Sequence, residues 1–114
     1  MTKEVYIIAQ IAVKDYKTYF EKYALPFSEI LPKFKGEVLA STTKCEVVEG
    51  ENFGNWTVLL KFPSEELAHA CINSEAYAPL AEVRINELTT GGNVLLIPGY
   101  KNPYLPSRRQ PARQ

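Results

Sequence analysis

The first apolar segment of the chain places the strongest constraint on its fold. Residues 5–13, VYIIAQIAV, are rich in β-branched side chains, which is typical of a β-strand. Side chains of a strand alternate between the two faces of its sheet. Here both alternating sets are apolar, with Gln10 as the polar exception. Both faces of the sheet must therefore be covered, which limits the folds that the chain can adopt.

Three further strands are predicted. Residues 37–49 form the second, and the small polar side chains of residues 41–43 predict a bend or a bulge within it. A turn rich in Gly and Asn follows at residues 50–55. Residues 56–62, WTVLLKF, form the third strand, and residues 94–97 form a short last one.

Helical regions separate these strands. Asp15 is a suitable N-cap, because its carboxylate can accept hydrogen bonds from the free amides of a first helical turn. Apolar side chains recur at three- and four-residue spacing over residues 16–34, and Pro26 among them predicts a kink. Ser64 caps a second helix. A third helix follows, and we expect the Gly-Gly-Asn sequence at residues 91–93 to end it.

The predicted order is β-α-β-β-α-(α)-β, which indicates an α+β fold of the ferredoxin-like, split βαβ type: a four-stranded antiparallel sheet with helices on one face. A single layer of helices cannot cover both faces. Yet the third strand alone carries an apolar set on one face, formed by Trp56, Val58, Leu60 and Phe62. Such a surface drives association. We therefore expect a homodimer with two sheets packed face to face, although the pattern does not say which face meets the partner.

The chain of 114 residues is long enough for one domain, which we place at residues 1–98. Residues 99–114 are rich in Pro and Arg and are predicted to form an extended tail. Thirteen basic and thirteen acidic side chains balance, which argues against nucleic acid or an anionic membrane as a partner. No apolar segment approaches the roughly 20 residues that span a bilayer. We expect a cytoplasmic protein whose Cys45 and Cys71 are reduced thiols.

Several of these features occur together in one family. The first half of the chain shows them as Asp15, Tyr19, Gly36 and Val48-Glu49-Gly50. The second half shows them as Phe62-Pro63-Ser64, Asn73-Ser74-Glu75-Ala76-Tyr77 and Arg84. Together they resemble the domain of unknown function 1330 family, within the dimeric α+β barrel superfamily. The resemblance implies a ferredoxin-like protomer that dimerises through its sheet into a barrel.

Two positions depart from the pattern that this resemblance implies. Family members usually carry Arg or Gly in the middle of the second strand, where this chain has Ser-Thr-Thr at residues 41–43. They usually have an aromatic side chain near the end of the second helix, where this chain has Cys71. Both departures are expected to reshape a pocket.

Arg84 is the most informative single residue. On helical spacing it falls within an apolar stripe that contains Tyr77, Leu80, Ala81 and Leu88. One interpretation is structural: the stem lies on the stripe and the charged head reaches water or a carboxylate. The other is functional: the guanidinium enters a cavity and offers its donors to a carboxylate, an enolate or a phenolate.

The same two interpretations apply to the aromatic residues, which are either core or pocket lining. Tyr19 holds a position that matches the family and joins Arg84 as a candidate catalytic residue, supplying an oxyanion donor or an acid. Gln10 is expected to orient a ligand from the sheet, or to be an amide at the sheet edge or dimer interface. The candidate ligand-binding residues are Tyr77, Gln10, Tyr6, Tyr23 and Trp56.

The residues predict no metal site and no cofactor, because no cluster of ligating side chains is present. His69 is expected to be exposed beside Glu65. Two functional hypotheses remain open. One is a small-molecule-binding protein that acts as a cofactor-independent enzyme of monooxygenase, isomerase or dehydratase type on an anionic or enolisable, aromatic or polyketide-like compound. The other is a non-catalytic module that binds a metabolite or a protein.

Overall fold

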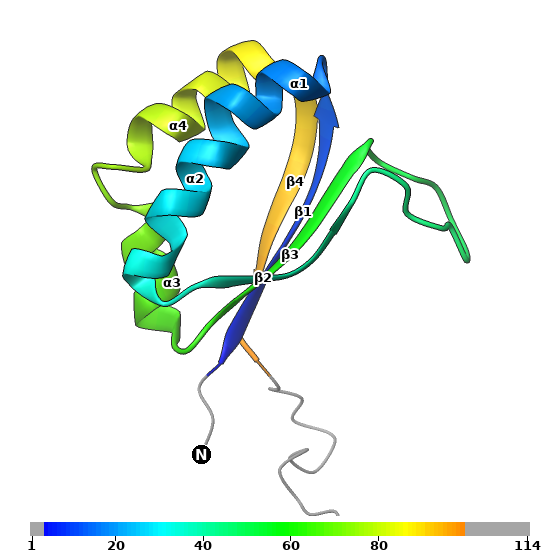
Figure 1. The fold of residues 1–114 in the computed structure, drawn as a ribbon. Coiled ribbons are helices and arrows are strands. Elements are labelled where there is room, and N and C mark those ends of the chain that lie inside the picture. Colours follow the sequence, from blue (N-terminus) through cyan, green and yellow to red (C-terminus); the bar gives the residue numbers. More distant parts are fainter. Residues whose placement is uncertain (1–3, 100–114) are drawn as a thin grey trace, which may run out of the picture.

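The computed structural model describes residues 4–99, which form one antiparallel sheet with all the helices on one of its faces (Figure 1). The strand order across the sheet is β2-β3-β1-β4. The strands are β1 (Val5–Val13), β2 (Glu37–Thr42), β3 (Trp56–Phe62) and β4 (Thr89–Ile97). This is the predicted ferredoxin-like α+β fold. The tail predicted for residues 99–114 lies outside the described residues from residue 100 onward.

The helical layer contains two stretches. The first runs without interruption through α1 (Tyr16–Tyr19), η1 (Phe20–Ala24), α2 (Leu25–Ile30) and η2 (Leu31–Phe34). The second contains α3 (Glu65–Ile72), α4 (Ala78–Val83) and η3 (Arg84–Leu88). The N-caps are as predicted: the Asp15 carboxylate accepts a hydrogen bond from the Thr18 amide, and the Ser64 hydroxyl accepts one from the Leu67 amide.

Pro26 changes the winding of the first helical stretch. The preceding turn, η1, is a π-helical turn, in which the Leu25 amide donates to the Phe20 carbonyl five residues earlier. Proline has no amide hydrogen, and its ring clashes with the carbonyl one turn back in a regular α-helix. A wider turn just before Pro26 relieves this conflict, so the irregularity that proline was predicted to cause is present as a π turn.

Two strand boundaries differ from the prediction. The second strand ends at Thr42, and its irregularity is the extra residue Leu39, where the pairing with β3 shifts between Val38 and Ala40. The last strand begins at Thr89 and includes the glycines that were expected to end a helix. A Cβ atom at Gly92 would lie 3.0 Å from the Gln10 carbonyl oxygen, so this glycine allows β4 to approach β1 closely.

The register decides which side chains face the helices. Ile11 is opposite Trp56 and Ile7 is opposite Leu60, so the odd-numbered residues of β1 share a face with the apolar set of β3. This face packs against the helices in two separate clusters. One is formed by Val5, Ile7, Ile30, Leu31, Leu60, Phe62, Ala68 and Cys71. The other is formed by Ile11, Val13, Tyr19, Tyr23 and Leu88.

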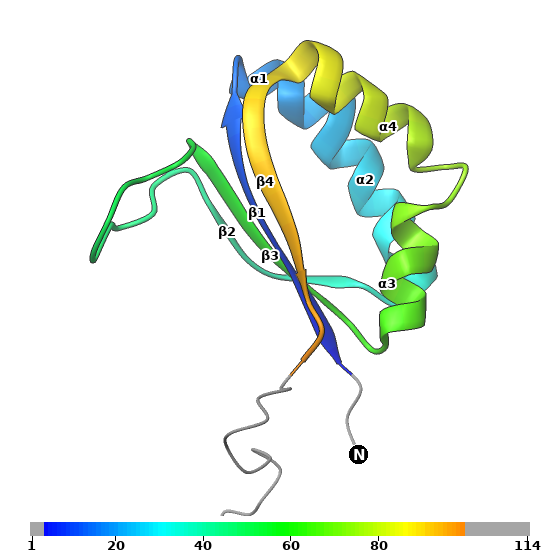
Figure 2. The same ribbon diagram turned by 180° about the vertical axis from the view of Figure 1, so that it is seen from behind.

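The opposite face of the sheet has no helix over it, as both views show (Figures 1 and 2). Ile8 of β1 pairs with Leu59 and Leu95, so these apolar side chains lie together on this open face. Leu95 is 60% exposed, and Ile97 is 42% exposed. The apolar set of β3 that was expected to drive association, Trp56, Val58, Leu60 and Phe62, is thus on the face that the helices cover. The uncovered face instead carries Ile8, Leu59, Leu95 and Ile97, and its burial by a second copy stays a prediction.

Residues 43–55, between β2 and β3, extend from the sheet on the side away from the helices (Figures 1 and 2). Their C-terminal base is fixed to β1. The Val13 amide donates to Asn55 Oδ1 at 2.8 Å, and Asn55 Nδ2 donates to the Val13 carbonyl at 2.9 Å. A Cβ atom at Gly54 would lie 2.5 Å from the Ile11 carbonyl oxygen, so glycine is needed for this close approach.

Asn55→Ala should destabilise the fold, because both polar groups of Val13 lose a partly buried partner. We expect the free energy of unfolding to fall by about 1–3 kcal/mol, measured by urea denaturation. Asn52→Ala is the matched control in the same segment, since its 3.5 Å contact with the Gly54 amide is exposed. Equal losses in the two variants would contradict the role given to Asn55.

Candidate functional site

A cavity of about 330 Å³ lies between the helices and the sheet, where the two core clusters do not meet. Ala9 of β1 and Ala24 of η1 are part of its wall. Because alanine side chains are small, they leave space at the centre of a helix–sheet interface that larger residues would fill. One end of the wall is mainly aliphatic, with Leu31, Leu60 and Ile7. The other end is aromatic and carries the charged group.

Arg84, the first residue of η3, also lines this cavity. Its Nε atom is buried and has no hydrogen-bond partner within the described residues. No ion pair joins its guanidinium to a carboxylate of residues 4–99. The guanidinium carbon lies 5.4 Å from the centre of the Tyr23 ring, within cation–π distance. The cation thus lies against an aromatic ring and interacts with the Tyr23 and Tyr77 side chains, and its Nε–H is the donor that lacks an acceptor among residues 4–99.

Two tyrosine hydroxyls meet next to this cation. The Tyr23 and Tyr77 oxygens are 2.6 Å apart, at the short end of the usual hydrogen-bond range. Either hydroxyl can donate to the other, and each has one hydrogen. One hydrogen of the pair therefore remains for a third acceptor. The Tyr23 ring also stacks on Phe27, with ring centres 5.7 Å apart, which fixes its orientation.

The electrostatics of the cavity favour neutral tyrosines and a charged arginine. Burial raises the pKa of Tyr19 to about 12, against an opposing effect of Arg84. Burial and the nearby Tyr77 raise the pKa of Tyr23 as well. Burial also acts against the charge of Arg84, but Tyr23 and Tyr77 act in its favour, and the pKa of Arg84 lies above its usual value. At neutral pH the site therefore contains one cation and several hydroxyl donors.

Irregular helical turns place two of these residues. Tyr23 lies in the π turn η1, and Arg84 begins the π turn η3. Such turns occur frequently at functional sites, because they shift a side chain out of its regular helical direction. Tyr77 is placed differently. Its amide donates to the Ser74 hydroxyl at 3.1 Å, and that hydroxyl donates to the Cys71 carbonyl at 2.8 Å.

Five of the seven candidate residues line this one cavity: Arg84, Tyr19, Tyr23, Tyr77 and Trp56. They come from the first helical stretch, from β3 and from the segment between Tyr77 and η3. Helical and strand spacing had singled out each residue separately. The structure brings them together; that they bind or act on a ligand stays a prediction.

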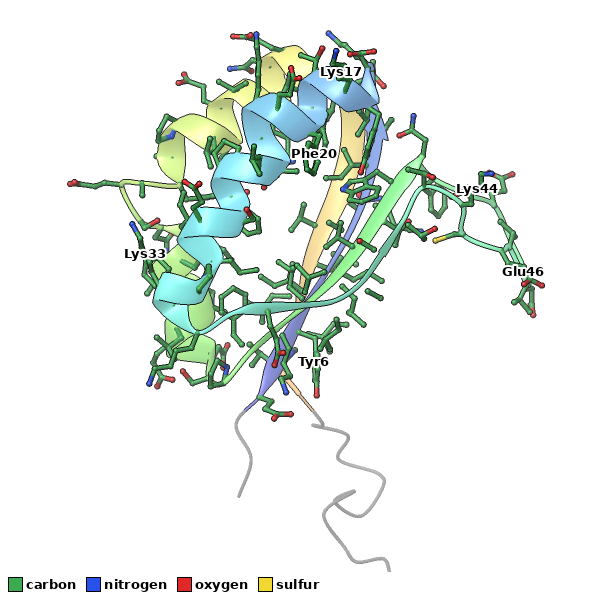
Figure 3. All side chains as sticks on the ribbon, in the orientation of Figure 1. Tyr6, Lys17, Phe20, Lys33, Lys44 and Glu46 are labelled. Atoms are coloured by element: carbon green, nitrogen blue, oxygen red, sulfur yellow. The ribbon has the colours of Figure 1, made fainter. Side chains whose placement is uncertain are left out.

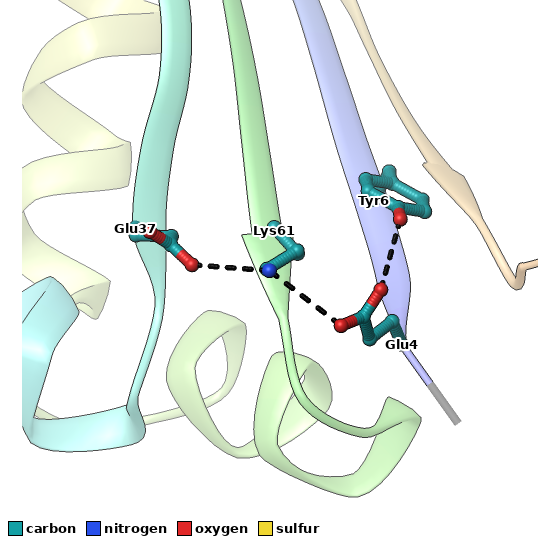
Figure 4. A network of polar contacts seen from close by, with 4 residues as sticks. All are labelled: Glu4, Tyr6, Glu37 and Lys61. Atoms are coloured by element: carbon teal, nitrogen blue, oxygen red, sulfur yellow. Dashed lines mark hydrogen bonds and ion pairs between the residues drawn. The ribbon is translucent and has the colours of Figure 1, made fainter. Parts of the chain in front are cut away.

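Tyr6 and Gln10 are not part of this cavity, contrary to the expectation. Both are even-numbered residues of β1 and therefore face the open side of the sheet. The Tyr6 side chain lies on the side away from the helices (Figure 3), and its hydroxyl donates to Glu4 at 3.1 Å. Lys61 bridges that carboxylate and Glu37 at 3.5 and 3.3 Å (Figure 4). Gln10 is therefore on the face of the predicted dimer interface, and it is not at the sheet edge, because β1 lies between β3 and β4.

The sequence reasoning did not assign several lining residues to a site. Phe27 belongs to the same helical stripe as the tyrosines, so its three- and four-residue spacing was an available signal. Ser41 and Cys71 line the cavity as well. Both belong to segments that the resemblance led us to expect would reshape a pocket. For Ala9 and Ala24, the only available sequence signal was that each is a small residue within a stripe of large apolar ones.

The remaining candidates lie elsewhere. His69 is exposed, with its Nε2 atom 3.9 Å from the Glu65 carboxylate, as expected. Cys45 and Cys71 are free thiols, but only Cys71 is buried. Among residues 4–99 no group of three His, Cys, Asp or Glu side chains is suited to a metal ion. In the same range, no helix is long and apolar enough to cross a membrane.

Comparisons with known proteins agree with this architecture. A family profile described as a domain of unknown function (DUF1330) matches residues 4–100. A protein of unknown function from Rhodopseudomonas palustris superposes with a TM-score of 0.70 at 10% identity, covering 90% of this chain and 86% of that one. A search of curated proteins gives no match.

Two further solved structures share the fold. SnoaB from Streptomyces nogalater, described as a cofactor-independent oxygenase, has a TM-score of 0.59 at 13% identity and covers 90% of this chain and 99% of its own. A dimeric ferredoxin-like protein of unknown function from Thermobifida fusca has a TM-score of 0.59 at 12% identity, with 86% and 92% covered. At these identities the similarity shows the fold alone.

The raised pKa of Tyr19 predicts a loss of stability in alkali. Its phenol titrates near pH 10 in the unfolded chain and near 12 in the folded one. Its contribution is therefore complete below pH 10 and is lost as the pH rises from 10 to 12. We expect the free energy of unfolding to fall by on the order of 2 kcal/mol over this interval, in denaturant titrations. Tyr19→Phe should remove this part of the pH dependence, and an unchanged alkaline slope would refute the assignment.

Proposed function

Because the chain belongs to the domain of unknown function 1330 family and forms an apolar cavity lined by a cation that pairs with no carboxylate of residues 4–99, we propose that each subunit binds a small organic anion there. The observation that carries this proposal is the buried Nε atom of Arg84, which has no acceptor among residues 4–99. A buried polar or charged group without a partner costs free energy. A carboxylate, enolate or phenolate of a ligand would supply the missing acceptor.

The lining and the volume of the cavity indicate the size and the apolar character of the rest of this ligand. Aromatic rings of Tyr19, Tyr23, Phe27, Trp56 and Tyr77 surround the charged end, and aliphatic side chains form the other end. Planar rings pack well against such walls. The volume of about 330 Å³ is at the small end of ligand pockets, which hold roughly 300–1,000 Å³. We therefore propose a compact aromatic or polyketide-like compound that carries one anionic or enolisable group.

The protein is proposed to act as a homodimer in which the open faces of two sheets pack together. The support is the apolar surface formed by Ile8, Leu59, Leu95 and Ile97, which a second copy would cover. The relative from Thermobifida fusca is described as dimeric, and this chain covers most of it. The free thiols of Cys45 and Cys71 support the proposed cytoplasmic location.

Two versions of the function are open to experiment. The cofactor-independent enzyme is favoured by the Tyr23–Tyr77 pair, which can donate to charge that develops on a bound oxygen. SnoaB, which shares the fold and is described as a cofactor-independent oxygenase, supports the enzyme version. The non-catalytic binding module is favoured by the lining within residues 4–99. Its single carboxylate, Glu37, is paired with Lys61 and is therefore not free to act as a base. Turnover measured across pH with phenolic and β-keto compounds separates the two, since binding without turnover identifies a binding module.

Arg84→Met should abolish binding of anionic ligands. The variant keeps an unbranched apolar side chain but removes the cation, so we expect affinity for phenolic and β-keto anions to fall at least about tenfold in calorimetric titrations. The melting temperature should change little, because the substitution removes the buried Nε–H that lacks an acceptor together with the favourable contact between the guanidinium and Tyr23.

Arg84→Lys is the companion variant, since it retains the charge without the planar fork of donors and should bind with intermediate affinity. A large loss of stability in Arg84→Met together with unchanged ligand affinity would show that Arg84 has only a structural role.

Leu95→Glu should weaken the dimer, because it places a charge in the proposed sheet–sheet interface. Ile85→Glu is a matched control: Ile85 lies in the helical layer and has the same 60% exposure as Leu95. Sedimentation velocity should show dimers for the wild type and the control, and monomers for Leu95→Glu at the same concentration. A monomeric wild type would end the dimer proposal.

A further inference from the structure

The polar groups at the aromatic end of the cavity are all hydrogen donors to an anion. The guanidinium of Arg84 has only N–H donors and no acceptor atom. Between them, Tyr23 and Tyr77 use one hydroxyl hydrogen in their 2.6 Å contact and have one hydrogen left. Tyr19, which is 2% exposed, adds a third hydroxyl to the same wall.

Within residues 4–99, the lining of the cavity offers no imidazole and no unpaired carboxylate that could take a proton from a ligand. The titratable groups on the lining are Tyr19 on α1, Tyr23 on η1, Tyr77 before α4, Cys71 on α3, Glu37 on β2 and Arg84 on η3. Residues of β1, β3 and β4 that line it are not titratable. Burial raises the pKa of the Cys71 thiol, and Glu37 is held by Lys61. The only histidine of the chain, His69, lies outside the cavity.

We propose that the cavity selects acidic phenols and enols and holds them as anions, with the ligand's own proton released to water. This inference rests on the proposed function and adds the protonation state in which the ligand binds and the destination of its proton. The O–H bond of the ligand breaks, the oxygen keeps the electron pair, and the proton leaves to bulk solvent or buffer. The protein supplies no base in this step. Its contribution is to stabilise the anion that remains.

The ligand anion is stabilised by the guanidinium of Arg84, which lies in the wall of the cavity. A guanidinium and a ligand oxygen at contact distance attract each other far more strongly in a partly dehydrated cavity than in water. The spare hydroxyl hydrogen of the Tyr23–Tyr77 pair adds a second donor to the same oxygen. For the fixed phenols of Tyr19 and Tyr23 burial outweighs the effect of Arg84 and their pKa is raised. A ligand oxygen in direct contact with the guanidinium would take the acceptor position that Nε lacks, and a cation in such contact with an acidic group lowers its pKa by about 1–3 units. By linkage, one such unit means that the anion binds tenfold more tightly than the neutral phenol.

The test uses 4-nitrophenol, whose ionised form absorbs visible light. The wild-type protein, in excess over the probe, is titrated with acid and base, and the midpoint of the absorbance change is compared with that of the free probe. We expect the midpoint of the bound probe to lie at least about one pH unit lower. Arg84→Met should lose this shift, while Lys22→Met, which removes an exposed cation from the helix of Tyr23, should keep it.

The outcomes separate this inference from the proposed function on which it rests. If 4-nitrophenol binds but its midpoint is unchanged or higher, the inference is overturned, because the cavity then does not prefer the phenolate. Binding of benzoate, an anion throughout the titration, then decides whether the proposed anion binding stands. The inference is also overturned if the shift persists in Arg84→Met, with Arg84→Gln, which likewise removes the cation, as the second variant should the first fail to fold. If neither 4-nitrophenol nor benzoate binds at any pH, both proposals are overturned.

Discussion

The guanidinium of Arg84 reaches the space between the helices and the sheet, and within residues 4–99 no carboxylate pairs with it there. A charge in such a place is partly dehydrated; Tyr23 and Tyr77 offset this cost, since the pKa of Arg84 lies above its usual value, but the buried Nε–H is left without an acceptor in the same range. The ring of Tyr23 lies within cation–π distance, and the nearby hydroxyls are acceptors of modest strength. The rest of the site can be understood as the structure needed to hold this cation and to leave room for an acceptor.

That room has a structural origin. The face of the sheet that meets the helices is divided into two packed clusters, and the cavity lies where small side chains such as Ala9 and Ala24 take the place of larger ones. Filling this space with methyl groups would be expected to increase stability, because protein interiors pack densely and cavities cost free energy. The π turns that carry Tyr23 and begin at Arg84 are a second departure from the most regular packing. Stability and a binding site compete for the same volume.

Much of the fold could be predicted, because its signals are local. Apolar alternation predicts β1 and β3 with the bounds that the structure has, and the caps Asp15 and Ser64 begin helices as expected. The errors occur where a local signal has two meanings. Glycines after a helical segment are typical of a helix end, but here Gly92 allows close contact between β4 and β1. That contact depends on a neighbouring strand, which local periodicity does not describe.

By itself, the sequence determined the order of the elements, the single layer of helices and the anomaly of a cation in an apolar stripe, because each follows from the spacing of neighbouring residues. Only the tertiary structure decided which side chains share a space. The register between β1 and β3 turns Trp56 toward the helices and Tyr6 and Gln10 away from them, although all three belong to apolar strands. Which face a strand presents to the helices depends on pairing between segments far apart in the chain, and so does the group of residues around Arg84.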